Sequence, residues 1–379
     1  MIYLDNAATT FPKPNEVYNE VDKCLRTYCA NPGRGSHDMS LQCELKIFTC
    51  RERLSKLFNI EDPLRIIFTS NTTESLNIAI KGVLKPGDHV ITTMIEHNSV
   101  LRPLYSLKAM NIETTILPVD LKGYLNLCDI KDSVKSNTKA IIVNHGSNVL
   151  GTVQDIEAIG ALAKSLGLIF IVDAAQTAGY CDIDVKKMNI DLLAFPGHKS
   201  LLGLQGTGGL YISDNMNLST LKDGGTGSNS ESMIQPDFYP DKMESGTLNA
   251  PGIVGLNEGV NFILNKGVKE IRSHETEIME YLTCELKKLP YIKLYGETNA
   301  SIKTPVLSLN MDRFDSSEIG EFLNNKGIYL RTSYHCAPLI HKIIGTEGKG
   351  TVRVSPGYFN TFNDIEALIN TLINIYNFS

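Results

Sequence analysis

Short apolar runs alternate with amphipathic segments between about residues 50 and 215. Several runs are almost continuously apolar, which is typical of strands that helices cover on both faces. Segments 73–81 and 155–166, between runs, carry apolar residues at helical spacing. The pattern predicts an α/β protein with a mostly parallel seven-stranded sheet, with strands expected at 65–69, 89–93, 114–118, 140–144, 168–172, 191–195 and 209–213.

From about residue 252 the pattern changes to longer amphipathic segments. Helices are expected at 252–266 and 268–289, and then a strand, a helix, a strand and a helix at 305–311, 316–326, 327–331 and from 363. This order is typical of a smaller α+β domain. Residues 223–243, rich in glycine, serine, asparagine and proline, form a linker or an interface loop between the two patterns. We expect a large domain of residues 13–251 and a smaller domain of residues 1–12 and 252–379.

Composition excludes several classes of protein. Apolar residues make up 42% of the 379 residues and charged residues 21%, which excludes a disordered chain. The net charge is 36 − 42 = −6 without a basic cluster, so no nucleic-acid partner is expected. No apolar run approaches the roughly 18 residues that span a bilayer, and the first residues do not resemble a signal peptide. We therefore expect a cytoplasmic protein with no membrane partner.

The eight cysteines include no CxxC pair. This spacing argues against a disulfide scaffold and against a zinc ribbon. A metal site formed by Cys24, Cys29, Cys43 and Cys50 is the alternative. However, Cys43 and Cys50 lie seven residues apart on an expected helix and are expected to face the core. We expect no metal, and we expect any functional cysteine to act as a thiol.

Two neighbouring expected strands end in residues suited to catalysis. Asp173 follows the run that begins at Leu168, and Lys199 follows the run that begins at Asp191. Open α/β sheets bind ligands at the carboxyl ends of their strands, so the acid and the amine are expected at one crevice. A helix cap and a solvated lysine are the separate alternatives. Together the pair indicates pyridoxal phosphate (PLP), because lysine forms an imine with its aldehyde and a carboxylate keeps its ring nitrogen protonated.

Other residues are suited to the remaining parts of this cofactor. Its phosphate needs donors, and residues 67–77 supply a strand, a polar turn and a helix start where such donors converge. We expect Thr72 and Thr73 to bind the phosphate together with His198, although an ordinary helix cap is the alternative for this turn. His97 follows another expected strand, where its ring is placed to lie against the cofactor, and a structural histidine is the alternative.

Cys336 and Arg353 are candidates for the chemistry on a substrate. A nucleophilic cysteine needs positive or proton-accepting neighbours, because a free thiol with a pKa of about 8.5 is mostly protonated at pH 7. Arg331 and His335 are the expected neighbours, and a buried inert cysteine is the alternative. Arg353, in a strand-like run, is expected to bind a carboxylate with two hydrogen bonds, whereas an exposed strand arginine is the alternative.

These segments resemble the class V aminotransferase superfamily, and within it the cysteine desulfurase and selenocysteine lyase group. The resemblance covers nearly the whole chain in the family's order, and the short Arg-x-x-x-His-Cys-Ala loop is similar to that of the group II, SufS-like enzymes. The matching pieces are residues 3–8, 71–74, 96–97, 147–152, 172–176, 197–199, 245–247, 331–337 and Arg353.

The resemblance implies a PLP-dependent transferase of fold type I, a homodimer with its active site at the subunit boundary. It assigns Lys199 to the Schiff base, Asp173 to the pyridine nitrogen, Gln176 to the ring hydroxyl and His97 to stacking on the ring. The phosphate residues that it implies are Thr72, Thr73 and His198, with Thr247 reaching in from the partner subunit. The substrate residues are Arg353 at the carboxylate, Asn148 beside cofactor and substrate, and Arg34 and His37 along the pocket.

Two positions depart from the family's pattern. Pro196 stands where many relatives have a hydroxyl residue that helps bind the phosphate, so one hydrogen bond is expected to be lost or supplied elsewhere. Ser333 replaces the glycine that is common in the cysteine loop, so a stiffer loop and an altered substrate preference are expected.

The expected activity is PLP-dependent cysteine desulfuration. L-Cysteine gives L-alanine, and the thiolate of Cys336 takes the sulfur as a persulfide and passes it to a sulfur-acceptor protein. The alternative enzyme is a selenocysteine lyase or cysteine sulfinate desulfinase, with a link to selenium metabolism or to molybdenum-enzyme maturation. The non-enzyme alternative is a degenerate α/β sulfur-carrier protein that forms no Schiff base.

Overall fold

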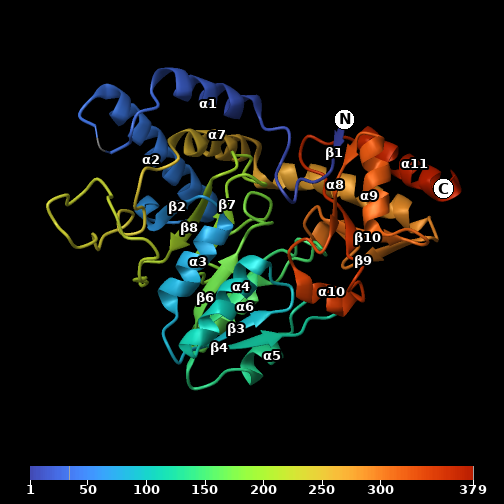
Figure 1. Ribbon diagram of the computed structural model, residues 1–379, viewed down its shortest axis with the longest axis horizontal. Helices are drawn as coiled ribbons and strands as arrows, with labels where there is room; N and C mark the ends of the chain where they lie inside the picture. Colours follow the sequence, from blue (N-terminus) through green and yellow to red (C-terminus); the bar gives the residue numbers. More distant parts are fainter. Residues whose placement is uncertain (34, 379) are drawn as a thin grey trace.

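The structure, a computed structural model, describes residues 1–33 and 35–378 and divides into two parts (Figure 1). The part at the left of Figure 1 surrounds a seven-stranded sheet, and the part at the right surrounds a four-stranded sheet. Both ends of the chain lie in the right-hand part. There β1 (Ile2–Tyr3) pairs in parallel with β11 (Ile328–Tyr329).

The large sheet has the strand order β2-β8-β7-β6-β5-β3-β4. The five strands from β7 to β4 in this order are parallel, and β8 is antiparallel to both of its neighbours. Its strands are β2 (Ile66–Thr69), β3 (His89–Thr93), β4 (Glu113–Leu117), β5 (Thr138–Asn144), β6 (Ile169–Asp173), β7 (Leu192–Pro196) and β8 (Gly208–Ile212). All seven lie within two residues of the predicted bounds, so the predicted sheet is confirmed.

Helices cover both faces of this sheet. Because alternate residues of a strand point to opposite faces, Ala140 and Ile142 pack with α3 and α4, whereas Ile141 and Val143 pack with α2, α6 and α7. Burial on both faces explains the nearly continuous apolar runs of the sequence. The helices of this part are α1 (Asn15–Thr27), α2 (Asp38–Phe58), α3 (Thr72–Val83), α4 (Asn98–Leu107), α5 (Leu127–Asp132), α6 (Ile156–Ser165) and α7 (Ala250–Lys266).

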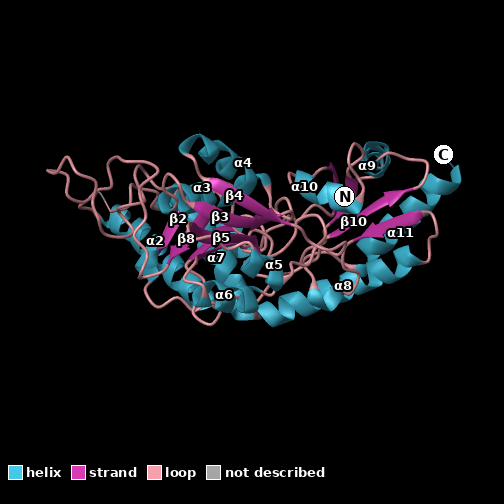
Figure 2. Cartoon of the chain, turned by 90° about the horizontal axis from the view of Figure 1, so that it is seen from below, coloured by secondary structure: helices cyan, strands magenta, loops and turns pink. Residues whose placement is uncertain are grey.

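The second part contains an antiparallel sheet with the order β12-β13-β10-β9. Its buried residues pack against α8, α9 and α11, and Figure 2 shows α8 and α11 below the sheet. The strands are β9 (Ile292–Tyr295), β10 (Leu307–Met311), β12 (Arg331–Ser333) and β13 (Thr351–Val354). The helices are α8 (Val268–Lys287), α9 (Ser316–Asn325), α10 (Pro338–Ile344) and α11 (Phe362–Phe378).

Helix α7 links the two parts and bears on where they divide. Ile253, Val254 and Val260 of α7 belong to the core of the large sheet, although the sequence pattern assigned residues from 252 onward to the smaller domain. Gly267, between α7 and α8, has a φ of 88° and ends α7. The predicted division into residues 13–251 and residues 1–12 with 252–379 stays a prediction, and packing favours a boundary near Gly267.

Three further features bear on the expectations from composition. Cys43 and Cys50 are fully buried on α2, as predicted. Within residues 1–33 and 35–378, no cluster of three histidine, cysteine, aspartate or glutamate side chains is arranged to hold a metal ion. No helix in these ranges has the length and apolar character needed to cross a membrane.

Candidate active site

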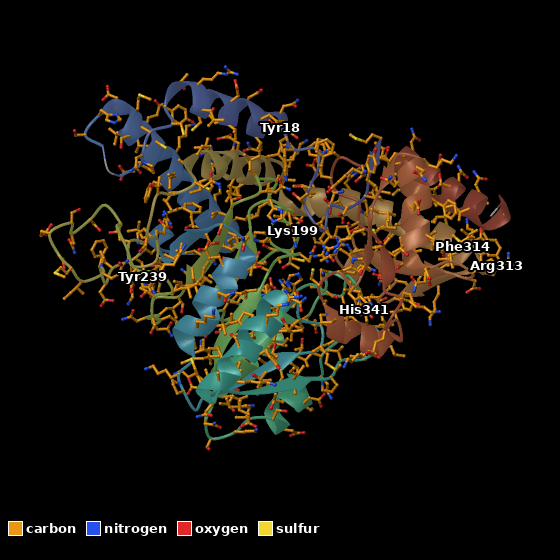
Figure 3. The ribbon with its side chains drawn as sticks, viewed as in Figure 1. Tyr18, Lys199, Tyr239, Arg313, Phe314 and His341 are labelled. Carbon is orange, nitrogen blue, oxygen red and sulfur yellow. The ribbon has the colours of Figure 1, made fainter. Side chains whose placement is uncertain are left out.

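Asp173 and Lys199 come from the ends of adjacent strands. β6 and β7 are parallel neighbours, and Asp173, the last residue of β6, is paired with Ala194 of β7. Lys199 follows the end of β7 by three residues. Figure 3 shows Lys199 near the middle of the molecule, between the two parts. The structure therefore brings the predicted acid and amine to one edge of the sheet.

The Asp173 carboxylate is buried and only partly hydrogen-bonded. Its Oδ1 accepts a hydrogen bond from the backbone N–H of Ala175 at 2.9 Å, whereas Oδ2 is buried without a partner among the described residues. Burial raises the pKa of Asp173 to about 6, against the opposing effects of the Ala175 hydrogen bond and the Lys199 charge. A cation brought to Oδ2 would stabilise the ionised carboxylate.

The Lys199 amine is surrounded by cations. Burial, followed by the positive charges of Arg353 and Arg331, lowers the pKa of Lys199 to about 8, although Asp173 and Asp5 act in the opposite direction. A substantial fraction of neutral amine is therefore present near neutral pH. That is the form that reacts with an aldehyde or accepts a proton.

His97 caps α4 and is held as a neutral imidazole. Its Nδ1 accepts a hydrogen bond from the backbone N–H of Ser99 at 3.1 Å and lies 2.8 Å from the Ser99 hydroxyl. Burial and the charge of Lys199, followed by Arg331 and Arg102, lower the pKa of His97 to about 4. The ring thus carries no charge near pH 7, which suits a flat ring that lies against another.

The N-terminus of α3 forms the candidate phosphate site. Asn71 caps this helix, and Thr72 and Thr73 are its first residues. A Cβ added to Gly208, at the start of β8, would lie 2.8 Å from the carbonyl carbon of Asn71, so only glycine allows this approach. His198, after β7, has a buried Nδ1 without a partner among the described residues. Free N–H groups at the helix start suit an anion.

The cysteine loop follows β12 and is shaped by three residues with positive φ. These are Ser333 at 100°, His335 at 50° and Cys336 at 62°. The Cys336 carbonyl accepts a hydrogen bond from the backbone N–H of Asn98 at 2.8 Å, and Asn148 Nδ2 donates to the His335 carbonyl at 2.6 Å. Asn98 and Asn148, which belong to the large part, thus hold the cysteine loop of the second part.

One of the two expected neighbours of Cys336 is confirmed and the other is not. Arg331 Nη2 donates to Cys336 Sγ at 3.3 Å, which places a positive charge beside the sulfur. His335 instead lies with Nε2 3.0 Å from Thr351 Oγ1, and burial lowers its pKa to about 2. The expectation that His335 activates the thiol is therefore wrong, because its ring is neutral and bound to β13.

Arg353 lies in β13 with only 1% of its surface exposed, so the exposed-arginine alternative is excluded. Its Nη2 donates to Asp5 Oδ1 at 2.7 Å, and its Nη1 donates to the Asn148 carbonyl at 3.2 Å. Its Nε is buried without a partner among the described residues. The Nε–H is therefore available to a carboxylate, and Nη1 and Nη2 each keep one further N–H beside the hydrogen bonds that they make.

A cavity of about 360 Å³ joins several predicted site residues. It is lined by Thr73 of α3, His97, and the half-buried Cys336. The thiol, the ring-stacking candidate and a phosphate candidate thus share one space. Lys199 does not line this cavity, but it lies close enough to His97 for its charge to lower the pKa of that imidazole.

The remaining predicted residues lie elsewhere or make other contacts. Gln176 Nε2 donates to the Ala7 carbonyl at 3.0 Å, and Thr247 is exposed beside Ser70 in a cavity of about 200 Å³. His37 caps α2 by accepting from the backbone N–H of Ser40 at 3.3 Å, and Arg34 lies outside the described residues. The predicted cofactor and substrate roles of these four residues stay predictions.

Sequence reasoning gave no role to Asp5 or Lys13. Asp5 pairs with Arg353 from 348 positions away, and no local pattern predicts such a pair. Lys13 is buried and donates to Thr10 Oγ1 at 2.6 Å and to the His198 carbonyl at 2.8 Å, and burial lowers its pKa to about 7. The match of residues 3–8 to the family was the one sequence signal for Asp5, and Lys13 had none.

The fold and the site define a PLP-dependent enzyme of fold type I. The model of the Aminotransferase class-V family matches residues 2–368, and the chain belongs to this family, as predicted. The group II, SufS-like branch within it stays a prediction.

Similar proteins and structures cover nearly the whole chain. A probable cysteine desulfurase of Methanothermobacter thermautotrophicus is 34% identical over 382 residues, which cover 99% of this chain and 94% of that protein. One of Borreliella burgdorferi is 32% identical over 97% of this chain and 90% of its own length. The apo structure of a cysteine desulfurase from Thermococcus onnurineus matches with a TM-score of 0.91 and 32% identity, covering 99% of this chain and 94% of that one.

The described residues fit the cofactor on which this family depends. Three of the residues predicted to hold it have buried polar atoms without partners among the described residues, namely Asp173 Oδ2, His198 Nδ1 and Asn148 Oδ1. Buried polar atoms are rarely left unpaired, so these atoms indicate a polar group that they bind. The Asp173 carboxylate suits the ring nitrogen of PLP, the Lys199 amine suits its aldehyde, and the N-terminus of α3 suits its phosphate.

The pKa of Lys199 predicts how the cofactor-free protein takes up PLP. Because this pKa is lowered to about 8, the neutral amine increases as the pH rises toward 8 and levels off above it. We expect the rate of PLP uptake, followed by visible absorbance, to show the same profile. Asp173→Asn removes a charge that raises the Lys199 pKa, so the midpoint should move to lower pH. Asp132→Asn, at an exposed residue of α5, is the control, and a wild-type midpoint above pH 10 would contradict the described environment.

The φ of Ser333 predicts the effect of restoring a glycine in the loop. A φ of 100° strains any residue with a Cβ, so Ser333→Gly should raise the free energy of unfolding by about 0.5–1 kcal/mol after the extra entropy of the unfolded chain is subtracted. Ser333→Ala keeps the Cβ and is the matched control. Chemical denaturation measures both. Equal stability of the two variants would show that the backbone at this position is not strained.

Proposed function

We propose that this protein is a PLP-dependent cysteine desulfurase, which converts L-cysteine to L-alanine and carries the sulfur as a Cys336 persulfide to an acceptor protein. The observation that carries the proposal is the position of Cys336. Its half-buried thiol shares a cavity with His97 and lies 3.3 Å from the guanidinium of Arg331. The relatives named cysteine desulfurase, which match 97–99% of this chain, support the same activity.

The cofactor and the protein contribute different parts of the chemistry. Bound PLP supplies an electron-accepting ring that weakens the bonds at the substrate's α-carbon. Asp173, through its unpartnered Oδ2, would supply the negative charge that keeps the ring nitrogen protonated, and the neutral His97 ring would lie against the cofactor without adding positive charge. Arg353, whose buried Nε has no partner among the described residues, would bind the substrate carboxylate and so orient the amino acid.

Lys199 and Cys336 move the proton and the sulfur. Lys199, with its pKa near 8, both accepts and returns a proton close to neutral pH. The Cys336 thiolate attacks the sulfur of the substrate, so that the substrate C–S bond breaks and an S–S bond forms. L-Cysteine and the Cys336 thiol thus yield L-alanine and a Cys336 persulfide, with no external oxidant or reductant. Arg331 stabilises the thiolate before the attack.

Replacement of the thiol tests this role. In Cys336→Ala we expect alanine formation from L-cysteine, measured with dithiothreitol as the acceptor, to fall at least about 100-fold, while the yellow colour of bound PLP remains. Cys284→Ala, at an exposed cysteine of α8, is the matched control. A normal rate of alanine formation in Cys336→Ala would contradict the persulfide role. Retained activity of this variant on selenocysteine alone would instead support the alternative lyase.

A homodimer completes the proposal and has its own support in the structure. Leu41, Leu45 and Phe48 form an exposed apolar stripe on α2, and Ile47 and Phe48 line a cavity of about 390 Å³ together with Leu248. Monomers rarely expose a contiguous apolar surface of this kind. A second copy of the chain would cover it and bring Thr247 and residues 31–33 and 35–37 toward the neighbouring site.

A charge in the apolar stripe tests the dimer. We expect Leu45→Glu to convert a dimer into a monomer, because an unpaired carboxylate cannot be buried in the contact without a large cost. Light scattering after gel filtration measures the mass. Leu121→Glu, at another exposed leucine, is the control that should stay dimeric. A monomeric wild-type protein would contradict the dimer.

A further inference from the structure

The cavity at Cys336 continues as a groove between α3 and α4. On α3 it is lined by Thr73, Asn77 and Lys81, which lie four residues apart and therefore share one face of the helix. On α4 it is lined by one stripe that includes Ser99 and Arg102. Figures 1 and 2 show the two helices side by side. The cysteine loop contacts the start of α4, where the backbone N–H of Asn98 donates to the Cys336 carbonyl. The stretch from Thr73 to Lys81 gives the groove a length of about 12 Å.

The charge of this groove is positive and not neutralised. Lys81 and Arg102 are exposed, and neither forms a salt bridge or a side-chain hydrogen bond within residues 1–33 and 35–378. No aspartate or glutamate lines the groove. The nearest acid along α3, Glu74, is paired with Lys222 and lines a different cavity.

The positive field extends to the bottom of the groove. The charges of Lys199, Arg331 and Arg102 all lower the pKa of His97. The protein as a whole carries a net charge of −6, so a cationic groove is a local feature and not a consequence of composition. Clefts lined by one sign of charge attract ligands of the opposite sign and accelerate their association.

We propose that the groove between α3 and α4 receives an acidic, cysteine-bearing segment of the protein that accepts sulfur from Cys336. This inference rests on the proposed function and adds the chemical class of the acceptor. Lys81 and Arg102 bind carboxylates of the segment, and its thiol reaches the half-buried Cys336 at the end of the groove. A polypeptide segment is favoured because the two cations lie on different helices along an elongated groove, at a distance from the thiol.

The transfer balances without a further reactant. The acceptor thiolate attacks the outer sulfur of the Cys336 persulfide, so that the S–S bond to Cys336 breaks and a new S–S bond forms on the acceptor. Cys336 leaves as a thiolate beside Arg331, whose Nη2 lies 3.3 Å from Sγ. The acceptor thiol loses one proton and the regenerated Cys336 thiol gains one.

The experiment compares two synthetic acceptors on the PLP-loaded protein. One peptide carries a central cysteine flanked by aspartates and glutamates, and the other carries lysines in their place. L-Cysteine loads Cys336, and mass spectrometry measures the initial rate at which each peptide becomes a persulfide. The ratio of the acidic to the basic rate is the readout. Comparing this ratio between protein variants cancels the intrinsic reactivity of each peptide and any change in cysteine turnover.

We expect the ratio in the wild-type protein to exceed the ratio in Lys81→Glu/Arg102→Glu by at least about tenfold at low salt, and the difference to shrink as ionic strength rises. Lys85→Glu/Lys108→Glu makes the same change of charge at exposed lysines outside the groove. This control should keep the wild-type ratio.

Three results would overturn the inference. The ratio is unchanged in Lys81→Glu/Arg102→Glu, the control pair changes it equally, or the groove variant alters the oligomeric mass, which would make the groove a contact between subunits. Alanine formation with dithiothreitol separates this inference from the proposed function. If wild-type protein forms no alanine, the proposed function fails and the inference with it, whereas alanine without a charge preference overturns the inference alone.

Discussion

The site depends on the parallel pairing of β6 with β7. Parallel neighbours end at the same edge of a sheet, and the register that pairs Asp173 with Ala194 sets how far the acid lies from the amine of Lys199. A slip of one residue would turn the Asp173 side chain to the opposite face. That slip would aim the carboxylate into the opposite layer of apolar helix side chains, where burial without a partner opposes its charge.

Burial also determines the electrostatics of the site. Asp173, His97 and Lys199 all have pKa values displaced toward their neutral forms, and burial is the largest cause in each case. A cofactor that carries both a cationic nitrogen and an anionic phosphate would restore charges that burial opposes. Binding of such a cofactor would therefore stabilise the charged forms of these side chains, and this stabilisation favours cofactor binding.

Local patterns in the sequence predicted the large sheet and its strand-end residues. Strand ends are local features, and the edge to which parallel strands point is a general rule, so the meeting of Asp173 and Lys199 was predictable. The contacts of Arg353 with Asp5 and of Asn148 with the His335 carbonyl join residues 348 and 187 positions apart, and only the tertiary fold reveals them. The role of His335 was predicted wrongly because its position next to Cys336 in the sequence does not determine the direction of its side chain, which contacts Thr351. The boundary was predicted at residue 252 because the pattern changes there to longer helices, and a helical pattern alone does not show which of two cores the helix packs against.

The pairing of the first residues of the chain with its last third has a consequence for synthesis. The strands of the large sheet all lie between Ile66 and Ile212, so this layer is complete early on the ribosome. β1 meets β11 only after residue 329 has emerged, and Asp5 meets Arg353 only after residue 353 has emerged. The nascent chain thus contains Asp173 and Lys199, which we propose hold the coenzyme, before it contains Arg353, which we propose binds the amino acid. The order of synthesis thus places the proposed coenzyme-binding residues ahead of the proposed substrate-binding arginine.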